Sequence, residues 1–529
     1  MTKDVKFELP DPALEQYTWV LWDEHGPSSR PPLLLGEGPF PGNDPSPLPR
    51  SIIVNGFMYM RDGGGFGFGN PFGMPEAPPR SVEDMRRWRQ VWLPEVEKVV
   101  VQLESFDPAS VPPGAWQRTL AAQSADQMRV FAGVHRTTIF PGHQALQRFR
   151  QAFLARFGQE RLDDLEALLM GAPNASVDRA VKLWELSRVL RAAPALLDAL
   201  DRGTDLPEGP RADAFREGFA GLMAEYGATT NADLEDLPTW REDRSIPMAI
   251  IRAYARQPDE SGPRAAARRQ RERRLQIEAE LRELARTDAS AAALVPLMEM
   301  AQEFVPNLED HNYHSDQRIS AASRARWLAI GRHLRAKGML AAPDDVFYLQ
   351  REELVSTLEG QREPSKAVLA ERRRVLAEAR ATMPPPFLGR PLAALPEKPS
   401  APHAAETRVL RGYGASPGSY RGRARLIETL QEAGGLEQGE IMVCRTTSPP
   451  WTPFFGVIGA LVTNSGGALS HGAVVAREFG IPAVVGTMLA TLQIPDGATI
   501  TVDGTNGLVI RSEERRVGKE CRSRWSPYH

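Results

Sequence analysis

Long apolar runs and cysteine are both scarce in this sequence. It contains no run of eighteen apolar residues, so we expect no transmembrane helix. The polar N-terminus, from Met1 to Glu8, has no apolar core of the kind found in secretory signals. Two cysteines, Cys444 and Cys521, do not indicate a disulfide framework. These absences predict a cytoplasmic protein that has no membrane partner.

A strong excess of charge is also absent. The formal net charge is −3, which gives the whole chain no general attraction to nucleic acid. Hydrophobic residues make up 42% of the sequence and charged residues 25%, as in ordinary globular proteins. A length of 529 residues favours several domains over one.

Proline and glycine are unevenly distributed along the chain. Residues 1–80 are rich in both, and we expect an irregular segment there that packs on the middle domain, with one loose strand at Ser51–Met60. Residues 381–407 contain repeated prolines and are interpreted as a semi-rigid linker. Residues 511–529 follow the last strand-like segment and are interpreted as a non-native tail derived from a sequencing adapter.

Between residues 81 and 380 the apolar residues recur mostly at helical spacing. This pattern predicts a mainly α-helical domain. The expected helices are Val82–Ser105, Trp116–Val134, His143–Gln159, Leu162–Leu169, Val177–Leu200, Ala212–Tyr226, Ala265–Arg286, Ala292–Phe304 and Gln317–Lys337.

A strand–turn–helix pattern near residue 470 carries the chemistry. An apolar strand is expected at Val457–Val462, and Gly466 and Gly467 then interrupt the strand pattern. His471 follows Ser470 at the start of a short helix that we expect over Gly472–Phe479.

These residue types suit a phosphorylated histidine. Two glycines let backbone N–H groups approach an anion, and a helix start adds unpaired N–H groups and partial positive charge. A neutral imidazole is a competent nucleophile, so His471 can accept a phosphoryl group whose oxygens the backbone would hold. The alternative from composition alone is an ordinary turn followed by a surface or capping histidine.

The sequence from Gly466 to Gly486 closely resembles the phosphohistidine signature of the PEP-utilising enzymes, which include pyruvate phosphate dikinase, PEP synthase and rifampin phosphotransferase. Similar blocks lie at Gly414–Gly418, Gly422–Arg425, Met442–Pro453, Asp496–Gly497 and Val502–Gly504. The resemblance implies an α/β swivelling phosphohistidine domain at residues 408–510, with His471 as the phosphoryl carrier. Leu469 replaces the threonine of the dikinases and matches the rifampin phosphotransferase branch.

The same resemblance places a polar loop beside the carrier histidine. Thr446, Thr447 and Ser448 could hydrogen-bond to phosphoryl oxygens, and Arg445 could offset their charge. The predicted phosphate-binding set is therefore Gly466, Gly467, Ser470, Thr446, Thr447 and Arg445. An ordinary polar loop is the alternative.

The helical domain at residues 81–380 contains short blocks that resemble the acceptor-binding region of rifampin phosphotransferase and of the related phenylphosphate synthase subunit. Its second block includes His311, which is a candidate base for an acceptor hydroxyl. His311, His314 and Asp310 are also possible metal ligands, but a polar lining of the inter-domain cleft is the preferred interpretation, and no metal is expected.

The predicted fold is therefore multidomain, with a mainly α-helical N-terminal and middle region followed by the α/β swivelling domain. We expect this chain to transfer a phosphoryl group from an ATP-grasp partner to a hydroxyl of a small organic acceptor. It would bind no cofactor by itself, with ATP and Mg²⁺ on the partner. The alternatives are a non-catalytic regulatory or binding paralogue, or a fragment of a full-length enzyme.

Overall fold

A computed structural model of the protein describes residues 6–21, 51–55, 57–61, 82–230, 235–259, 262–380, 382, 384–385, 387–390, 409–467 and 470–511. Residues 512–529, which make up nearly all of the predicted tail, lie outside the described residues. Arg511 is described and is the last residue of a strand, so this strand extends one residue into the predicted tail.

Residues from both ends of the helical region form a small antiparallel sheet in the order β2-β3-β1-β4. Its strands are β1 (Thr18–Leu21), β2 (Ser51–Val54), β3 (Phe57–Arg61) and β4 (Phe387–Gly389). The loose strand expected at Ser51–Met60 corresponds to two strands, β2 and β3. Strand β1 was not expected, and β4 falls inside the predicted linker. Such short strands give little periodic signal, and β4 pairs with β1 across most of the chain.

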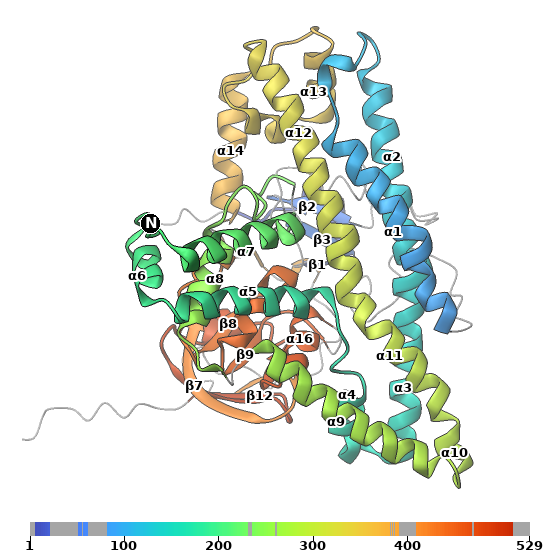
Figure 1. The fold of residues 1–529 in the computed structure, drawn as a ribbon. Helices are drawn as coiled ribbons and strands as arrows, with labels where there is room; N and C mark the ends of the chain where they lie inside the picture. The colour runs from blue at the N-terminus through green and yellow to red at the C-terminus, as the bar shows by residue number, and fades with distance from the viewer. Residues whose placement is uncertain are drawn as a thin grey trace, which may run out of the picture.

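The helical region runs from residue 82 to residue 380, and Figure 1 shows α11 and α12 forming its long diagonal beside α1, α2 and α3. Its helices are α1 (Val82–Glu104), α2 (Trp116–Val134), α3 (Phe140–Phe157), α4 (Leu162–Leu168), α5 (Ala175–Arg191), α6 (Pro194–Arg202), α7 (Pro210–Tyr226), α8 (Ser245–Ala255), α9 (Pro263–Leu284), α10 (Ala289–Ala292), α11 (Leu294–His311), α12 (Arg318–Ala336), α13 (Arg351–Leu358) and α14 (Lys366–Arg380). The predicted helix Val177–Leu200 is two helices, α5 and α6. Pro194, which has no backbone N–H to donate, is the first residue of α6.

Two wide π-helical turns interrupt this region. The first, η4 (His135–Ile139), joins α2 to α3, and the second, η7 (Asn312–Gln317), joins α11 to α12. π-helical turns occur mainly as single turns within α-helices and often at functional sites. The two turns lie close together, since the ring centroids of His135 and His311 are 5.2 Å apart.

The C-terminal domain is built on an eight-stranded sheet in the order β5-β12-β11-β7-β8-β9-β10-β6. Strands β7 to β10 are parallel, and the outer pairings are antiparallel. The strands are β5 (Val409–Arg411), β6 (Tyr413–Ser416), β7 (Ser419–Leu426), β8 (Ile441–Cys444), β9 (Ala460–Thr463), β10 (Ala483–Val485), β11 (Thr499–Asp503) and β12 (Leu508–Arg511). Its helices are α15 (Leu430–Ala433), α16 (His471–Phe479) and α17 (Ala490–Gln493). Only Gly412 separates β5 from β6, so one stretch of chain supplies both outer strands.

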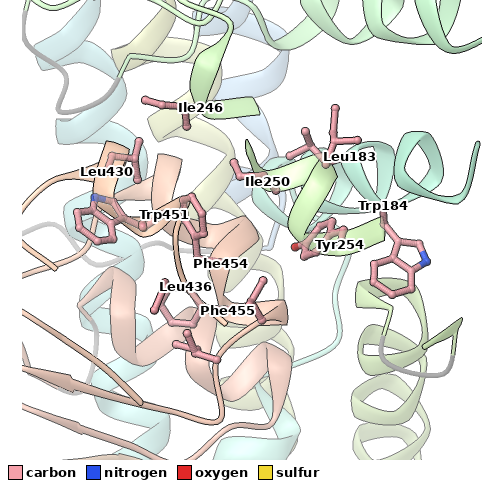
Figure 2. Packing of buried hydrophobic residues seen from close by; sticks show 14 of the residues in the cluster. Leu183, Trp184, Ile246, Ile250, Tyr254, Leu430, Leu436, Trp451, Phe454 and Phe455 are labelled. Carbon is pink, nitrogen blue, oxygen red and sulfur yellow. The ribbon is translucent and has the colours of Figure 1, made fainter. Parts of the chain in front are cut away.

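This domain packs on the helical region through a shared apolar core. Trp451, Phe454 and Phe455 are buried together with side chains of α5 and α8, as Figure 2 shows. The Tyr254 hydroxyl of α8 donates a hydrogen bond to the Pro453 carbonyl. The observed fold is thus the predicted one, a multidomain protein with a mainly helical region followed by an α/β domain. In the described part of the chain, no helix combines the length and apolar character that spanning a membrane requires.

Candidate active site around His471

The loop between β9 and α16 positions His471. Gly466 has φ +119°, a conformation that side chains disfavour. Ser470 is the N-cap of α16, and its hydroxyl donates a 2.9 Å hydrogen bond to the Gly467 carbonyl. His471 is the first residue of the helix, as the glycine pair and the apolar spacing predict.

The two glycines provide a matched pair of substitutions. A Cβ at Gly466 would lie 2.8 Å from Ser470 Oγ, whereas nothing lies within 4 Å of a Cβ at Gly467. We expect Gly466→Ala to lower the free energy of unfolding by about 1–2 kcal/mol, because alanine is strained at this positive φ. The substitution should also slow phosphorylation of the chain, because the added Cβ displaces Ser470. Gly467→Ala should be nearly neutral. Urea unfolding measures the first effect, and equal stabilities of the two variants would contradict it.

His471 lies between two elements that are far apart in the sequence. Its Nδ1 is 3.2 Å from Glu309 Oε1 of α11, and its Nε2 is 3.4 Å from Thr452 Oγ1 of η9 (Pro449–Gly456). The Phe455 ring meets the imidazole edge-on, with 6.2 Å between centroids. An ionised carboxylate can only accept, so in the neutral form of the ring Nδ1 carries the proton and Nε2 carries the lone pair.

Glu309 is held as a buried carboxylate. Ser176 Oγ donates to its Oε2 at 2.5 Å, and the side chain is 5% exposed. Burial alone would raise the pKa of Glu309, but the adjoining His471, the Ser176 hydrogen bond and the charge of Arg179 together keep that pKa below its ordinary value. An ionised Glu309 can therefore orient His471 and stabilise positive charge on its ring.

The predicted phosphate-binding residues do not all gather at this site. Thr447 is buried against the helix start, since a Cβ at Gly472 would lie 2.7 Å from Thr447 Oγ1. The Arg445 guanidinium instead lies 5.9 Å from the centre of the Phe57 ring of β3. Thr446 is half-buried, and no described contact joins it to His471.

His311 is held away from the imidazole of His471. Its Nδ1 lies 2.7 Å from the Asn307 carbonyl, and its Nε2 faces Asp316 at 3.8 Å. Two residues along an α-helix turn by about 200°, so His311 and Glu309 project from opposite faces of α11. The described geometry gives the candidate base no contact with the carrier histidine.

Two functional contacts were missed by the sequence analysis. Glu309 lies beyond the predicted end of the helix Ala292–Phe304, and only a polar run in an otherwise apolar helix hinted at it. Thr452 lies within the block Met442–Pro453 that carries the family resemblance, whereas the predicted phosphate-binding threonines, Thr446 and Thr447, precede it in the chain. Contacts across domains leave no spacing pattern in a sequence.

A buried ionic network holds the far end of α16. Arg477 Nε lies 3.0 Å from Glu166 Oε2 of α4, and Glu166 also pairs with Arg150 of α3. Arg477 Nη1 donates to the Ala415 carbonyl at 2.7 Å. Removing one member of such a network leaves a buried charge, so these residues fix the helix that begins with His471.

Glu478, the neighbour of Arg477, gives the docked domain a pH dependence. Burial raises the pKa of Glu478 to about 7; nearby Glu309 adds to this, while the Gly171 N–H, Arg274 and Arg477 oppose it. The ordinary pKa of a glutamate is 4.5. Between pH 4.5 and about 7, the folded chain therefore keeps a proton on Glu478 that the unfolded chain has lost. This group therefore makes stability fall as pH rises through that window, by at most about 1.4 kcal/mol per pH unit.

We expect Glu478→Gln to match the parent at pH 5 and to be more stable than the parent at pH 8. The amide oxygen can still accept the 3.0 Å hydrogen bond from the Gly171 N–H, but no charge is buried. Urea midpoints of both proteins across pH 5–8 measure the difference. Parallel pH profiles for the two proteins would contradict the assignment.

Two parts of the chain match models of known protein families, one in the α/β domain and one in the helical region. Residues 436–507 match the family model for the PEP-utilising enzyme mobile domain. Residues 134–309 match the rifampicin phosphotransferase fourth domain. The chain therefore joins these two domains, and the predicted resemblance is confirmed.

Curated relatives agree with the family models. Chondramide synthase cmdD of Chondromyces crocatus is 32% identical over 456 residues, covering 80% of this chain and 12% of that protein. Rifampicin phosphotransferase of a Streptomyces species is 32% identical over 362 residues, covering 65% of this chain and 41% of that enzyme. Phosphoenolpyruvate synthase of Aeropyrum pernix is 42% identical over 126 residues, covering 23% of this chain and 15% of that enzyme. The chain thus spans less than half the length of each of these relatives.

Proposed function

We propose that this chain carries a phosphoryl group on His471 Nε2 and passes it to a hydroxyl of a small organic acceptor. The observation that carries the proposal is the 3.2 Å contact between His471 Nδ1 and the buried carboxylate of Glu309. In the docked arrangement that contact would keep the proton on Nδ1, which leaves Nε2 as the atom that carries the phosphoryl group. The start of α16 and the Thr452 hydroxyl, 3.4 Å from Nε2, lie where phosphoryl oxygens would need donors.

The transfer step balances as follows. The acceptor oxygen forms a bond to phosphorus while the P–N bond breaks. The electron pair of the P–N bond returns to Nε2. The hydroxyl proton passes to Nε2, which leaves an imidazolium whose Nδ1–H faces Glu309. Phosphoryl transfer depends mostly on positioning and charge stabilisation, so a fixed carboxylate and helix start supply what the step requires.

The helical region would supply the acceptor site, because α11 provides Glu309. The proposed donor is ATP, bound with Mg²⁺ on an ATP-grasp domain or subunit, in the cytoplasm. Since the His471 side chain is only 11% exposed in the docked arrangement, charging would require the α/β domain to swing away from α11. The family resemblance supports the proposed donor, and the burial of His471 supports the proposed domain movement.

The test is acid-labile phosphate incorporation. The purified chain is incubated with radiolabelled ATP or PEP, alone and together with a purified ATP-grasp protein from the same genome. Label that is lost in acid and retained in base indicates phosphohistidine. Absence of acid-labile label with both donors, with and without the partner, would contradict the proposal and favour a binding or regulatory role.

A further inference from the structure

The two π-helical turns bring together three side chains that the proposed function does not use. His135 begins η4, His311 ends α11, and Asp316 lies within η7. Asp316 Oδ2 lies 3.7 Å from His135 Nε2 and 3.8 Å from His311 Nε2. One nitrogen or oxygen of each residue falls within 4.8 Å of the others.

Backbone carbonyls orient both rings. His135 Nδ1 donates to the Phe131 carbonyl at 2.8 Å, and His311 Nδ1 donates to the Asn307 carbonyl at 2.7 Å. Each ring therefore carries its lone pair on Nε2, the atom that faces Asp316. Histidines that bind metals are oriented by this kind of second hydrogen bond.

The cluster is sheltered from solvent. The side chains of His135, His311 and Asp316 are 12%, 10% and 13% exposed.

We propose that His135, His311 and Asp316 bind one divalent first-row transition-metal ion, with Zn²⁺ as the best match. Two imidazoles and one carboxylate suit Zn²⁺ and neighbouring metals, whereas Mg²⁺ and Ca²⁺ favour sites built from oxygen alone. The 3.7 and 3.8 Å separations are too long for direct hydrogen bonds. Ligands about 2.0–2.1 Å from a central ion stand roughly 3.3 Å apart in a tetrahedron. The two ring nitrogens and the Asp316 oxygen would therefore draw together around the ion, and water would supply the fourth ligand.

The ion would join the two interrupted helix pairs. It would tie the α2–α3 junction to the α11–α12 junction, and α11 carries Glu309 on its opposite face. This site goes beyond phosphotransfer and departs from the sequence-based expectation that the chain binds no metal. The ligand set also differs from the one weighed there, because Asp310 instead pairs with Arg89 and accepts from the Ala175 N–H.

The test is Co²⁺ titration of the full chain after removal of metals by a chelator. One equivalent should produce visible d–d absorption bands that Zn²⁺ then abolishes by displacement. His135→Gln and His311→Gln should each weaken Co²⁺ binding at least tenfold. The matched control is His314→Gln. His314 lies in η7 with Asp316 but outside the ligand set, so this variant should bind Co²⁺ as tightly as the parent.

Circular dichroism of each variant separates lost binding from lost folding. Asp316→Asn replaces any histidine variant that fails to fold, and it should weaken binding in the same way. Thermal unfolding gives a second measurement, since Zn²⁺ should raise the melting temperature of the parent but not that of His311→Gln. No absorption bands in the parent, or bands that persist in the ligand variants, would overturn the proposal.

Discussion

Replacement of His471 is expected to reduce acid-labile phosphorylation by roughly 10³-fold or more, because the substitution removes the attacking nitrogen. Two variants separate chemistry from structure. His471→Ala removes the ring, and His471→Asn keeps an N–H donor that can still reach Glu309. The label is measured with the donor and partner that support phosphorylation of the parent chain.

The control for this substitution is His333→Ala. His333 lies near Trp116 in the helical region, with 6.3 Å between ring centroids, and takes no part in the site. It should label like the parent. Full labelling of His471→Asn, or loss of label in both His471 and His333 variants, would contradict the assignment of His471 as carrier.

Glu309→Gln is expected to slow phosphoryl transfer about 10²-fold while leaving the chain folded. The amide keeps the shape of the side chain and can still accept from Nδ1, but the negative charge that stabilises the imidazolium is gone. Rapid-quench measurement of label transfer gives the rate. The ¹⁵N chemical shifts of His471 report whether the Nδ1–H tautomer has lost its preference.

The neighbouring carboxylate provides the control for Glu309. Asp310 pairs with Arg89 and accepts from the Ala175 N–H, so Asp310→Asn should alter stability more than transfer. If both substitutions slow transfer equally, the effect of Glu309 is structural. An unchanged rate and tautomer in Glu309→Gln would show that the carboxylate does not orient His471.

The local structure around the carrier histidine could be predicted almost completely. The predicted helix Gly472–Phe479 corresponds to α16 (His471–Phe479), and the expected strand Val457–Val462 overlaps β9 (Ala460–Thr463). Predicted helices such as Trp116–Val134 also match, since amphipathic periodicity is a local property. The tertiary structure was needed for β4, whose pairing with β1 joins residues on either side of the whole helical region.

The sequence by itself determined the candidate histidine, its glycine turn and the resemblance to the PEP-utilising enzymes, because these depend on residues adjacent in the chain. The tertiary structure alone decided what surrounds that histidine. Glu309 reaches His471 from 162 positions away, while His311, which attracted attention in the sequence, projects from the opposite face of the same helix. The π-helical turns that bring His135 to His311 and Asp316 likewise follow from packing between distant helices, which leaves no periodic trace in the sequence.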